Sequence, residues 1–255
     1  MLLAVDIGNT NVTLGVFEGD KLVANWRLYT RLNQMPDEYA IVLLGLLKHS
    51  GLEVSDIDDV AISCVVPPLR STFTELCQKY FNLTPLVVGP GIKTGIRIRM
   101  DNPREVGSDR ICNAAAAHSL YHETAIVVAM GTAWVFDTIS AEGDYLGGAV
   151  APGIAIASEA LFTRTAALPR VELVKPKSAI GTNTVSAIQS GLIFGYAGLI
   201  DGVVSRIQEE LEQKALVIAT GGYAGLIARE TKVFDKVNPD LTLVGLRIIY
   251  QMNRA

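Results

Sequence analysis

Apolar runs separated by short polar turns open the chain and predict strands joined by turns and a helix. Residues 2–5 and 14–17 are apolar runs on either side of a polar stretch, which predicts a β-hairpin. Residues 21–29 alternate apolar and polar side chains and predict a third strand on the same sheet. Apolar residues recur at helical spacing between Pro36 and Gly51, where we expect a helix.

The pattern then changes to single strands and helices. Residues 57–65 and 85–88 predict buried strands, with a helix between them at residues 69–80. Residues 94–110 have no regular periodicity, whereas residues 111–121 have strong helix propensity. Three strands followed by alternating helix and strand describe one α/β lobe.

The second half of the chain begins as the first half does. Residues 125–137 form an apolar run, a glycine-containing turn and a second apolar run, and residues 145–153 predict a third strand. When residues 6–9 are aligned with residues 129–132, the glycine-containing turn of each half follows the first predicted strand of that half. This correspondence indicates a duplicated lobe.

The rest of the second half is mostly helical. We expect helices at residues 154–166, 184–213 and 224–229, a strand at residues 215–219 and an apolar amphipathic segment at residues 241–252. The chain as a whole is therefore predicted to be an α/β protein of two lobes, an N-terminal lobe of residues 1–117 and a C-terminal lobe of residues 118–255.

The polar stretch of the opening hairpin carries groups suited to phosphate. Gly8 lets a backbone approach a ligand closely, and Asp6 can orient a hydrated cation. Amide and hydroxyl groups that can donate to phosphate oxygens follow at Asn9, Thr10, Asn11 and Thr13. An ordinary polar hairpin turn is the alternative interpretation.

Two glycine turns, one from each lobe, would face each other across a cleft and could surround one polyphosphate. Neither turn has the glycine spacing of a Walker loop or of a Rossmann fold. The pattern therefore favours a kinase or ATPase of another class.

Asp109 is a candidate catalytic carboxylate. Gly107 or Ser108 can cap the helix that follows, which places Asp109 in the first helical turn. The helix dipole favours an ionised carboxylate there, and such a group could accept a proton from a substrate hydroxyl. An ordinary capping aspartate is the alternative.

Composition narrows the class of partner. A net charge of −4 without basic blocks argues against a nucleic-acid surface. Three widely spaced cysteines do not suggest a disulfide framework or a zinc site, so a reducing cytoplasm is expected. The longest apolar run, residues 125–136, is too short to span a bilayer, and we expect a soluble protein without a membrane association.

Seven short pieces, in order along the whole chain, resemble the type III pantothenate kinases. These pieces are Asp6 to Asn11, Asn102-Pro103 with Gly107 to Arg110, Gly131-Thr132-Ala133, Gly147-Gly148 with Pro152-Gly153, Ala167-Leu168-Pro169, Gly181 to Thr184, and Thr220-Gly221-Gly222. The resemblance implies two ribonuclease H-like lobes of the superfold of acetate kinase, sugar kinases and actin, with a nucleotide cleft between them. It implies ATP-dependent phosphorylation of pantothenate to 4′-phosphopantothenate, the first step of coenzyme A biosynthesis.

The resemblance also assigns roles to residues. The catalytic base would be Asp109, and Asp6 would hold the Mg²⁺ that accompanies ATP. ATP would bind Asp6, Ile7, Gly8, Asn9, Thr10, Asn11, Val12, Thr13 and Thr132. Pantothenate would bind Gly107, Ser108, Asp109 and Arg110, with Thr184 reaching the site across the interface of a homodimer.

Some of these residues have structural alternatives. Thr184 could simply cap the helix that follows it. Arg110 could belong to a surface ion pair, although the fork of its guanidinium suits a carboxylate. The dipeptides Gly147-Gly148 and Pro152-Gly153 could shape the backbone and touch no ligand.

The chain departs from the family pattern in the second lobe. The family has an aspartate that binds a monovalent cation, K⁺ or NH₄⁺, where this chain has Ala129, and hydroxyl residues where it has Trp134 and Val135. A methyl group cannot ligate an ion. Met100 is a lesser departure, because some relatives have a substrate-contacting tyrosine there.

Two functions from different classes follow. The first is an active pantothenate kinase with a weakened or absent monovalent-cation requirement, which is favoured by Asp6, Asp109 and Arg110. The second, favoured by Ala129 and Trp134, is a catalytically impaired homologue that binds nucleotide or pantothenate in a regulatory role. Another small-acid or sugar kinase is a weaker third interpretation.

Overall fold

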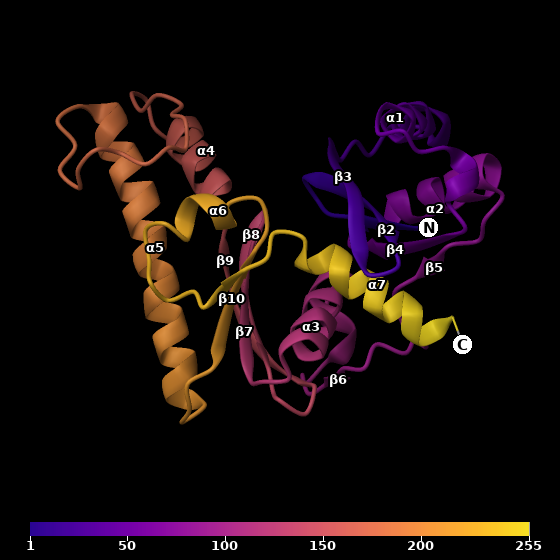
Figure 1. Cartoon of the computed structure of the whole chain (residues 1–255). Helices are drawn as coiled ribbons and strands as arrows, with labels where there is room; N and C mark the ends of the chain where they lie inside the picture. Colours follow the sequence, from indigo (N-terminus) through magenta and orange to yellow (C-terminus); the bar gives the residue numbers. More distant parts are fainter. Residues whose placement is uncertain (255) are drawn as a thin grey trace. The chain divides into compact units, whose positions relative to one another are not determined.

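The opening pattern of apolar and polar residues forms the predicted hairpin and third strand in the computed structural model, which describes residues 1–254 (Figure 1). Five strands lie in the order β3-β2-β1-β4-β5. The strands are β1 (Leu2–Ile7), β2 (Asn11–Glu18), β3 (Lys21–Tyr29), β4 (Asp59–Cys64) and β5 (Leu86–Val87). β1 pairs antiparallel with β2 and parallel with β4, so the carboxyl ends of β1 and β4 lie at the same edge of the sheet.

Helices cover both faces of this sheet. Alternate strand residues such as Val5, Leu14 and Ile62 pack with α1 (Pro36–His49) and α2 (Pro67–Leu76). The opposite face, which includes Leu2 and Ala4, packs with α3 (Ser108–Tyr121) and α7 (Leu241–Asn253). Short helical turns lie at Val54–Asp56, Cys77–Phe81 and Pro103–Glu105.

The second sheet repeats the topology of the first, as predicted. Its six strands lie in the order β11-β10-β7-β8-β9-β6. The strands are β6 (Arg97–Ile98), β7 (Ala125–Met130), β8 (Ala133–Ile139), β9 (Asp144–Pro152), β10 (Leu216–Thr220) and β11 (Lys236–Val237). β7 to β11 correspond to β1 to β5, because β7 pairs antiparallel with β8 and parallel with β10. The α/β class and the duplication are therefore confirmed.

One face of the second sheet packs against α4 (Ile154–Arg164), α5 (Thr184–Glu210) and the short α6 (Ala224–Ile227). In Figure 1, α5 runs along the side of this sheet, and α4 lies beside the upper part of α5. By length and composition alone, α5 could cross a membrane. Its side chains Ile193, Ile200 and Val204 are instead fully buried in the core of the second sheet, as in a core helix.

The chain divides into two compact units. Unit 1 contains Met1–Ile96, Asn102–Ser119 and the chain from Thr242 onward, and unit 2 contains Arg97–Asp101 and Leu120–Leu241. The division differs from lobes of residues 1–117 and 118–255 chiefly in the place of α7. This helix packs on the first sheet, because Leu243 and Leu246 complete the apolar layer around Leu2 and Ala4.

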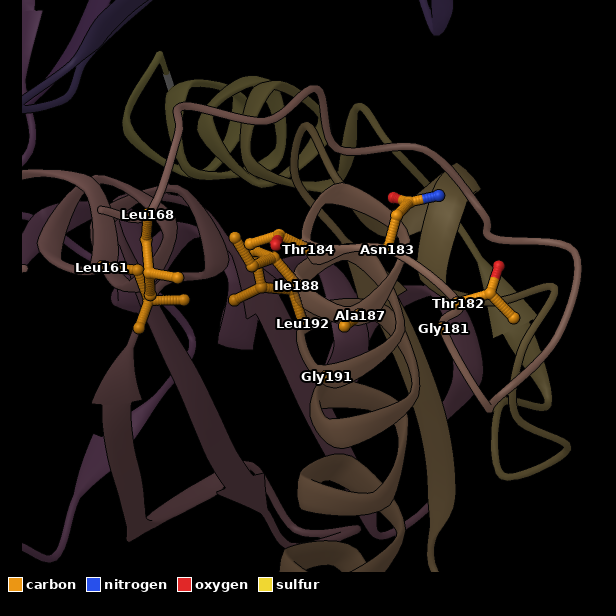
Figure 2. A pocket seen from close by; sticks show the side chains of 10 residues that line it. All are labelled: Leu161, Leu168, Gly181, Thr182, Asn183, Thr184, Ala187, Ile188, Gly191 and Leu192. Atoms are coloured by element: carbon orange, nitrogen blue, oxygen red, sulfur yellow. The ribbon is translucent and has the colours of Figure 1, made fainter.

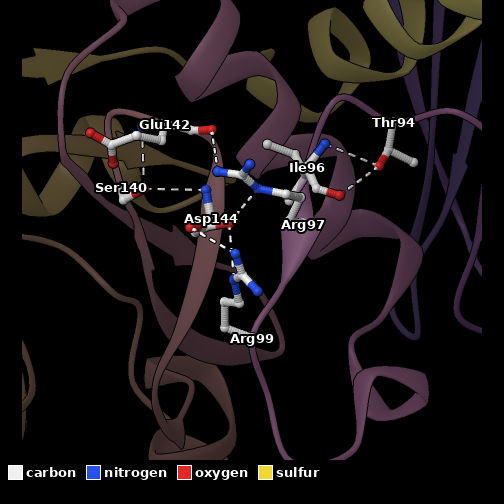
Figure 3. Close-up of polar contacts among 7 residues, drawn as sticks. All are labelled: Thr94, Ile96, Arg97, Arg99, Ser140, Glu142 and Asp144. Carbon is white, nitrogen blue, oxygen red and sulfur yellow. Dashed lines mark hydrogen bonds and ion pairs between the residues drawn. The ribbon is translucent and has the colours of Figure 1, made fainter.

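Two strands were not predicted, β6 and β11, and each has only two residues. β6 lies in the segment without periodicity and pairs with β9. Figure 3 shows that Asp144 of β9 accepts a hydrogen bond from Arg97 Nε at 2.6 Å and another from Arg99 Nε at 3.1 Å. Two residues are too few to show a period, so pairing with a neighbour defines this strand.

Candidate active site

A row of polar side chains crosses four strands of the first sheet. Asp6 of β1 lies opposite Ser63 of β4 on one side and Thr13 of β2 on the other, and Thr13 lies opposite Arg27 of β3. Residues directly opposite each other on neighbouring strands share a face. We call Ser63, Asp6, Thr13 and Arg27 the polar row. It lies on the face that α3 covers, beyond the apolar residues Leu2 and Ala4.

The glycine turn follows Asp6 directly. Its backbone closes on itself, because Gly8 N donates to Asn11 O at 3.0 Å. Thr30, at the end of β3, holds the turn from outside: its hydroxyl donates to Gly8 O at 2.6 Å, and its amide donates to Thr10 O at 3.0 Å. Asn9 and Thr10 are exposed.

Two of the predicted nucleotide contacts have side chains in the core. Ile7 and Val12 are fully buried among apolar residues of unit 1. Only their backbone groups could contact a phosphate.

The sequence did not single out Thr30 and Arg27, although the alternation over residues 21–29 placed Arg27 on the polar face of its strand.

The first turn of α3 lies at the polar row. The Ser108 hydroxyl is 3.0 Å from the Ser63 hydroxyl and accepts from the amide of Cys64 at 2.9 Å. Ser63 in turn donates to Asp6 Oδ1 at 2.9 Å. The helix begins as predicted: Gly107 O accepts from the amide of Ile111 at 3.1 Å, and Asp109 is in the first turn.

The position of Gly107 allows this arrangement. A Cβ at Gly107 would lie 2.5 Å from Asp109 Oδ1 and 3.2 Å from the Val65 side chain. Any larger residue would therefore displace the Asp109 carboxylate. The predicted group of Gly107, Ser108, Asp109 and Arg110 is thus brought together with Asp6 in unit 1.

Burial dominates the electrostatics of the two carboxylates. The pKa of Asp6 is raised to about 7, mainly by desolvation and to a lesser extent by repulsion from Asp109. The hydrogen bond from Ser63 lowers this pKa and offsets part of the increase. Desolvation also raises the pKa of Asp109, which the amide and charge of Arg110 partly offset. The expectation that the helix dipole keeps Asp109 ionised is therefore incomplete, because burial outweighs the helix N-terminus.

This pair of carboxylates fits a divalent cation. Asp6 is half-buried, ends β1 beside a glycine turn, and presents an oxygen ligand of the kind that Mg²⁺ prefers. A bound cation would relieve the repulsion that raises the Asp6 pKa. Among the residues that the structure describes, no group of three or more His, Cys, Asp or Glu side chains could hold a metal ion. Any ion here would therefore depend on Asp6, water and substrate oxygens for most of its ligands.

The second glycine turn, at Gly131 and Thr132, is built by close backbone contacts in unit 2. Gly131 N donates to Ala133 O at 3.2 Å, and Gly153 N donates to Thr132 O at 3.0 Å. A Cβ at Gly153 would lie 2.3 Å from Thr132 O, and one at Gly221, which has a φ of +92°, would lie 2.7 Å from Met130 O. These two glycines therefore shape the backbone, as the structural alternative held for Gly153.

The row of the second sheet that corresponds to the polar row is apolar at three of its four positions. Ala129 lies opposite Thr220 on one side and Val135 on the other, and Val135 lies opposite Val150. We call Thr220, Ala129, Val135 and Val150 the apolar row. None of its side chains carries a charge, so a monovalent cation finds no carboxylate in this row.

Trp134 faces the core of unit 2. It is fully buried and meets Tyr196 of α5 edge to face, with ring centroids 4.6 Å apart. Its indole nitrogen has no hydrogen-bond partner within residues 1–254, and the Tyr196 hydroxyl donates to Pro152 O at 3.0 Å. Trp134 thus contributes packing, and its indole presents no oxygen ligand to a cation.

Thr184 is not the cap of α5. Asn183 caps this helix, since its side chain accepts from the amide of Ser186 at 2.9 Å, and Thr184 is the first helical residue. Thr184 lines an open cavity of about 740 Å³ in unit 2 (Figure 2). In Figure 2, the side chains of Leu161 and Leu168 lie together on one side, and those of Ile188 and Leu192 lie across from them beside Thr184. Asn183 and Thr182 lie further from the leucines.

Comparison with solved structures shows the fold. The chain is similar to (R)-2-hydroxyglutaryl-CoA dehydratase component A of Acidaminococcus fermentans, with a TM-score of 0.59 and 12% identity over 99% of each chain. It is also similar to a ROK hexokinase of Thermus thermophilus, with a TM-score of 0.52 and 12% identity over 99% of each chain. This likeness supports the predicted superfold of sugar kinases and actin.

Comparison of sequences identifies the family. The sequence pattern of the type III pantothenate kinases matches residues 2–206. A type III pantothenate kinase of Dehalococcoides mccartyi is 58% identical over 100% of this chain and 97% of its own length. One of Moorella thermoacetica is 51% identical over 99% of this chain and 100% of its own length. The chain belongs to the type III pantothenate kinase family.

Proposed function

We propose that this protein transfers the γ-phosphoryl group of ATP to pantothenate and forms 4′-phosphopantothenate. Full-length relatives described as type III pantothenate kinases support this activity. The observation that carries it in this chain is the pair of carboxylates, Asp6 and Asp109, which lie close enough for Asp109 to raise the pKa of Asp6. Phosphoryl transfer needs a cation for the phosphates and a carboxylate for the nucleophile.

In this mechanism Asp109 is the base. Its carboxylate accepts the proton of the pantothenate hydroxyl as the oxygen forms a bond to the γ-phosphorus, and the bond from that phosphorus to the β,γ-bridging oxygen breaks to release ADP. The raised pKa of Asp109 suits this role, because a stronger base takes the proton more readily once it is ionised. Arg110 would pair with the pantothenate carboxylate.

Nucleotide binding would use the first glycine turn. Gly8 and the donors from Asn9 to Thr13 would hold phosphate oxygens, and Thr132 would add a donor from unit 2. Mg²⁺ held by Asp6 would neutralise phosphate charge when bound. Ser63 keeps Asp6 in place through its hydrogen bond at 2.9 Å.

We infer that the enzyme is active without a monovalent cation. Asp6, Asp109 and Arg110 are all present, whereas the apolar row offers no carboxylate to K⁺ or NH₄⁺. The cavity that contains Thr184 would complete the substrate site of a second copy in a homodimer. A cytoplasmic location follows from this activity, because both substrates are soluble metabolites.

The deciding experiment compares the protein with Asp109→Asn, which keeps the size of the side chain and removes the base. We expect ATP-dependent formation of 4′-phosphopantothenate by the protein, and a kcat about 10²–10⁴-fold lower in the variant with ADP binding retained. A protein that folds and binds ADP but does not phosphorylate pantothenate would support the impaired homologue with a regulatory role. Phosphorylation of another small acid or sugar would instead reassign the substrate.

A further inference from the structure

Arg27 occupies one end of the polar row. It lies opposite Thr13, which lies opposite Asp6, so two inter-strand spacings of about 4.8 Å separate the backbone of Arg27 from that of Asp6. Its neighbours Trp26 and Leu28 point to the other face and pack on the core of unit 1. The Arg27 side chain therefore lies on the same face as Asp6, Thr13 and the first turn of α3.

Among the described residues, the Arg27 guanidinium has no structural partner. Its side chain is exposed, and no hydrogen bond or ion pair of Arg27 occurs among residues 1–254. The other basic residue in strands β1 to β4 is Lys21, at the far end of β3 and opposite Glu18. Arg27 is thus the one positive charge that these strands bring near Asp6.

The end of β3 is held against the glycine turn. Thr30, three residues after Arg27, makes the two hydrogen bonds to Gly8 and Thr10, of 2.6 and 3.0 Å. A change in the position of the turn would therefore move the end of β3 with it. This connection keeps Arg27 in a fixed relation to the groups that would meet phosphate.

The turn lacks the positive charge that phosphate needs. From Asp6 to Thr13 there is no lysine or arginine, and Asp6 and Asp109 add two carboxylates. Phosphoryl-transfer sites neutralise the polyphosphate with cationic side chains as well as metal ions. The planar fork of a guanidinium binds phosphate oxygens in pairs.

We propose that Arg27 binds the nucleotide phosphates in this site, a role that rests on the function proposed above. The guanidinium extends along the polar row over Thr13 and donates to phosphate oxygens of ATP. Arg110, beside Asp109 on α3, is left for the carboxylate of the acceptor. The two arginines therefore serve different substrates.

Three variants test this assignment. Arg27→Ala removes the guanidinium, Arg27→Lys keeps a charge without the fork, and Lys21→Ala removes the matched positive charge at the far end of the same strand. Calorimetry gives the affinity for ADP with Mg²⁺, and steady-state kinetics give KM separately for ATP and for pantothenate. Circular dichroism checks that each variant is folded.

We expect Arg27→Ala to weaken ADP binding and raise KM for ATP by tenfold or more, with KM for pantothenate changed less than twofold. Arg27→Lys should recover part of the loss, and Lys21→Ala should behave as the parent protein. Unchanged ADP affinity in Arg27→Ala, an effect on KM for pantothenate alone, or a parent protein that binds no nucleotide would overturn the assignment. If the parent binds ADP through Arg27 but does not phosphorylate pantothenate, the proposed function fails and this role of Arg27 stands.

Discussion

At the scale of single residues, the position of Asp6 opposes the ionisation of its carboxylate. Its carboxylate ends β1 in a half-buried place beside a second carboxylate, and its pKa is raised from 3.8 to about 7. Between about pH 4 and pH 7, Asp6 therefore keeps its proton in the folded protein and has lost it in the unfolded chain. Ionisation of Asp6 at neutral pH works against folding in the absence of a cation or ligand.

Asp6→Asn should make the metal-free protein more stable at pH 8 and leave it inactive. The asparagine amide cannot ionise, so the variant avoids the destabilisation that ionisation of Asp6 causes as the pH rises from 4 to 8. We expect its free energy of unfolding to increase by about 1–2 kcal/mol at pH 8 and to change little at pH 4. Urea unfolding in EDTA at the two pH values measures this difference. A variant that is equally destabilised at both pH values would contradict the explanation.

Asp37→Asn is a control for Asp6→Asn, because its stability at pH 8 should change in the opposite direction. The Asp37 carboxylate accepts from Lys79 Nζ at 2.7 Å and from the Tyr80 hydroxyl at 2.8 Å, and these bonds lower its pKa. A carboxylate whose pKa is lowered by folding stabilises the folded protein at pH values above its ordinary pKa. This stabilisation is lost as the pH falls. Asp37→Asn should therefore lose stability at pH 8, although only slightly because the pair is exposed.

At the scale of elements, α7 and α3 approach unusually closely at a glycine. A Cβ at Gly245 of α7 would lie 1.8 Å from Cys112 O of α3. Gly245→Ala should therefore destabilise the protein by about 1–3 kcal/mol through overpacking, although alanine is the better helix former. Thermal unfolding measures the loss.

Gly45→Ala is the matched control for this contact. Gly45 also lies within a helix of unit 1, and a Cβ there would meet no atom within 4 Å. This variant should gain about 0.5–1 kcal/mol from helix propensity. If both alanine variants are stabilised, α7 does not pack on α3 at this distance.

The sequence predicted those elements whose own residues show a period. β3 begins and ends at the predicted residues 21 and 29, although its alternation is regular only from Ala24 onward, beyond a register shift against Val16 and Phe17 of β2. α3 was located by its alanines and its first turn. β6 and β11 could not be predicted, since a strand of two residues exists only through its neighbour. The capping of α5 by Asn183 was also missed, because Thr184 and Asn183 are both good caps in sequence.

At the scale of the whole molecule, chain order and spatial grouping differ. α7 is last in the chain but belongs to unit 1, where Leu243, Leu246 and Ile249 join the apolar layer of the first sheet. An apolar helical pattern shows that a helix is buried and does not show on which sheet. The same limit applies to Arg27, which sequence could place on the polar face of a strand but not two strands from Asp6.

The duplicated sheets have diverged at one corresponding row. The first sheet carries Asp6 and Thr13 where the second carries Ala129 and Val135, although the strand pairing is the same. A duplication preserves backbone topology more readily than side-chain chemistry, because the pairing depends on main-chain groups. Of these two corresponding rows, the one in the first sheet carries charged side chains and the one in the second sheet does not.

Restoring a carboxylate to the apolar row should create a response to monovalent cations. In Ala129→Asp the new carboxylate would lie opposite Thr220, whose hydroxyl could serve as a second oxygen ligand. At constant ionic strength, we expect K⁺ to stabilise this variant against thermal unfolding and to raise its kinase activity relative to tetramethylammonium. The parent protein and Ala129→Asn, which has no charge, should not distinguish the two ions. A parent protein stimulated several-fold by K⁺ would show that the ion binds elsewhere, and an Ala129→Asp variant that is folded but insensitive to K⁺ would show that the apolar row has lost more than its carboxylate.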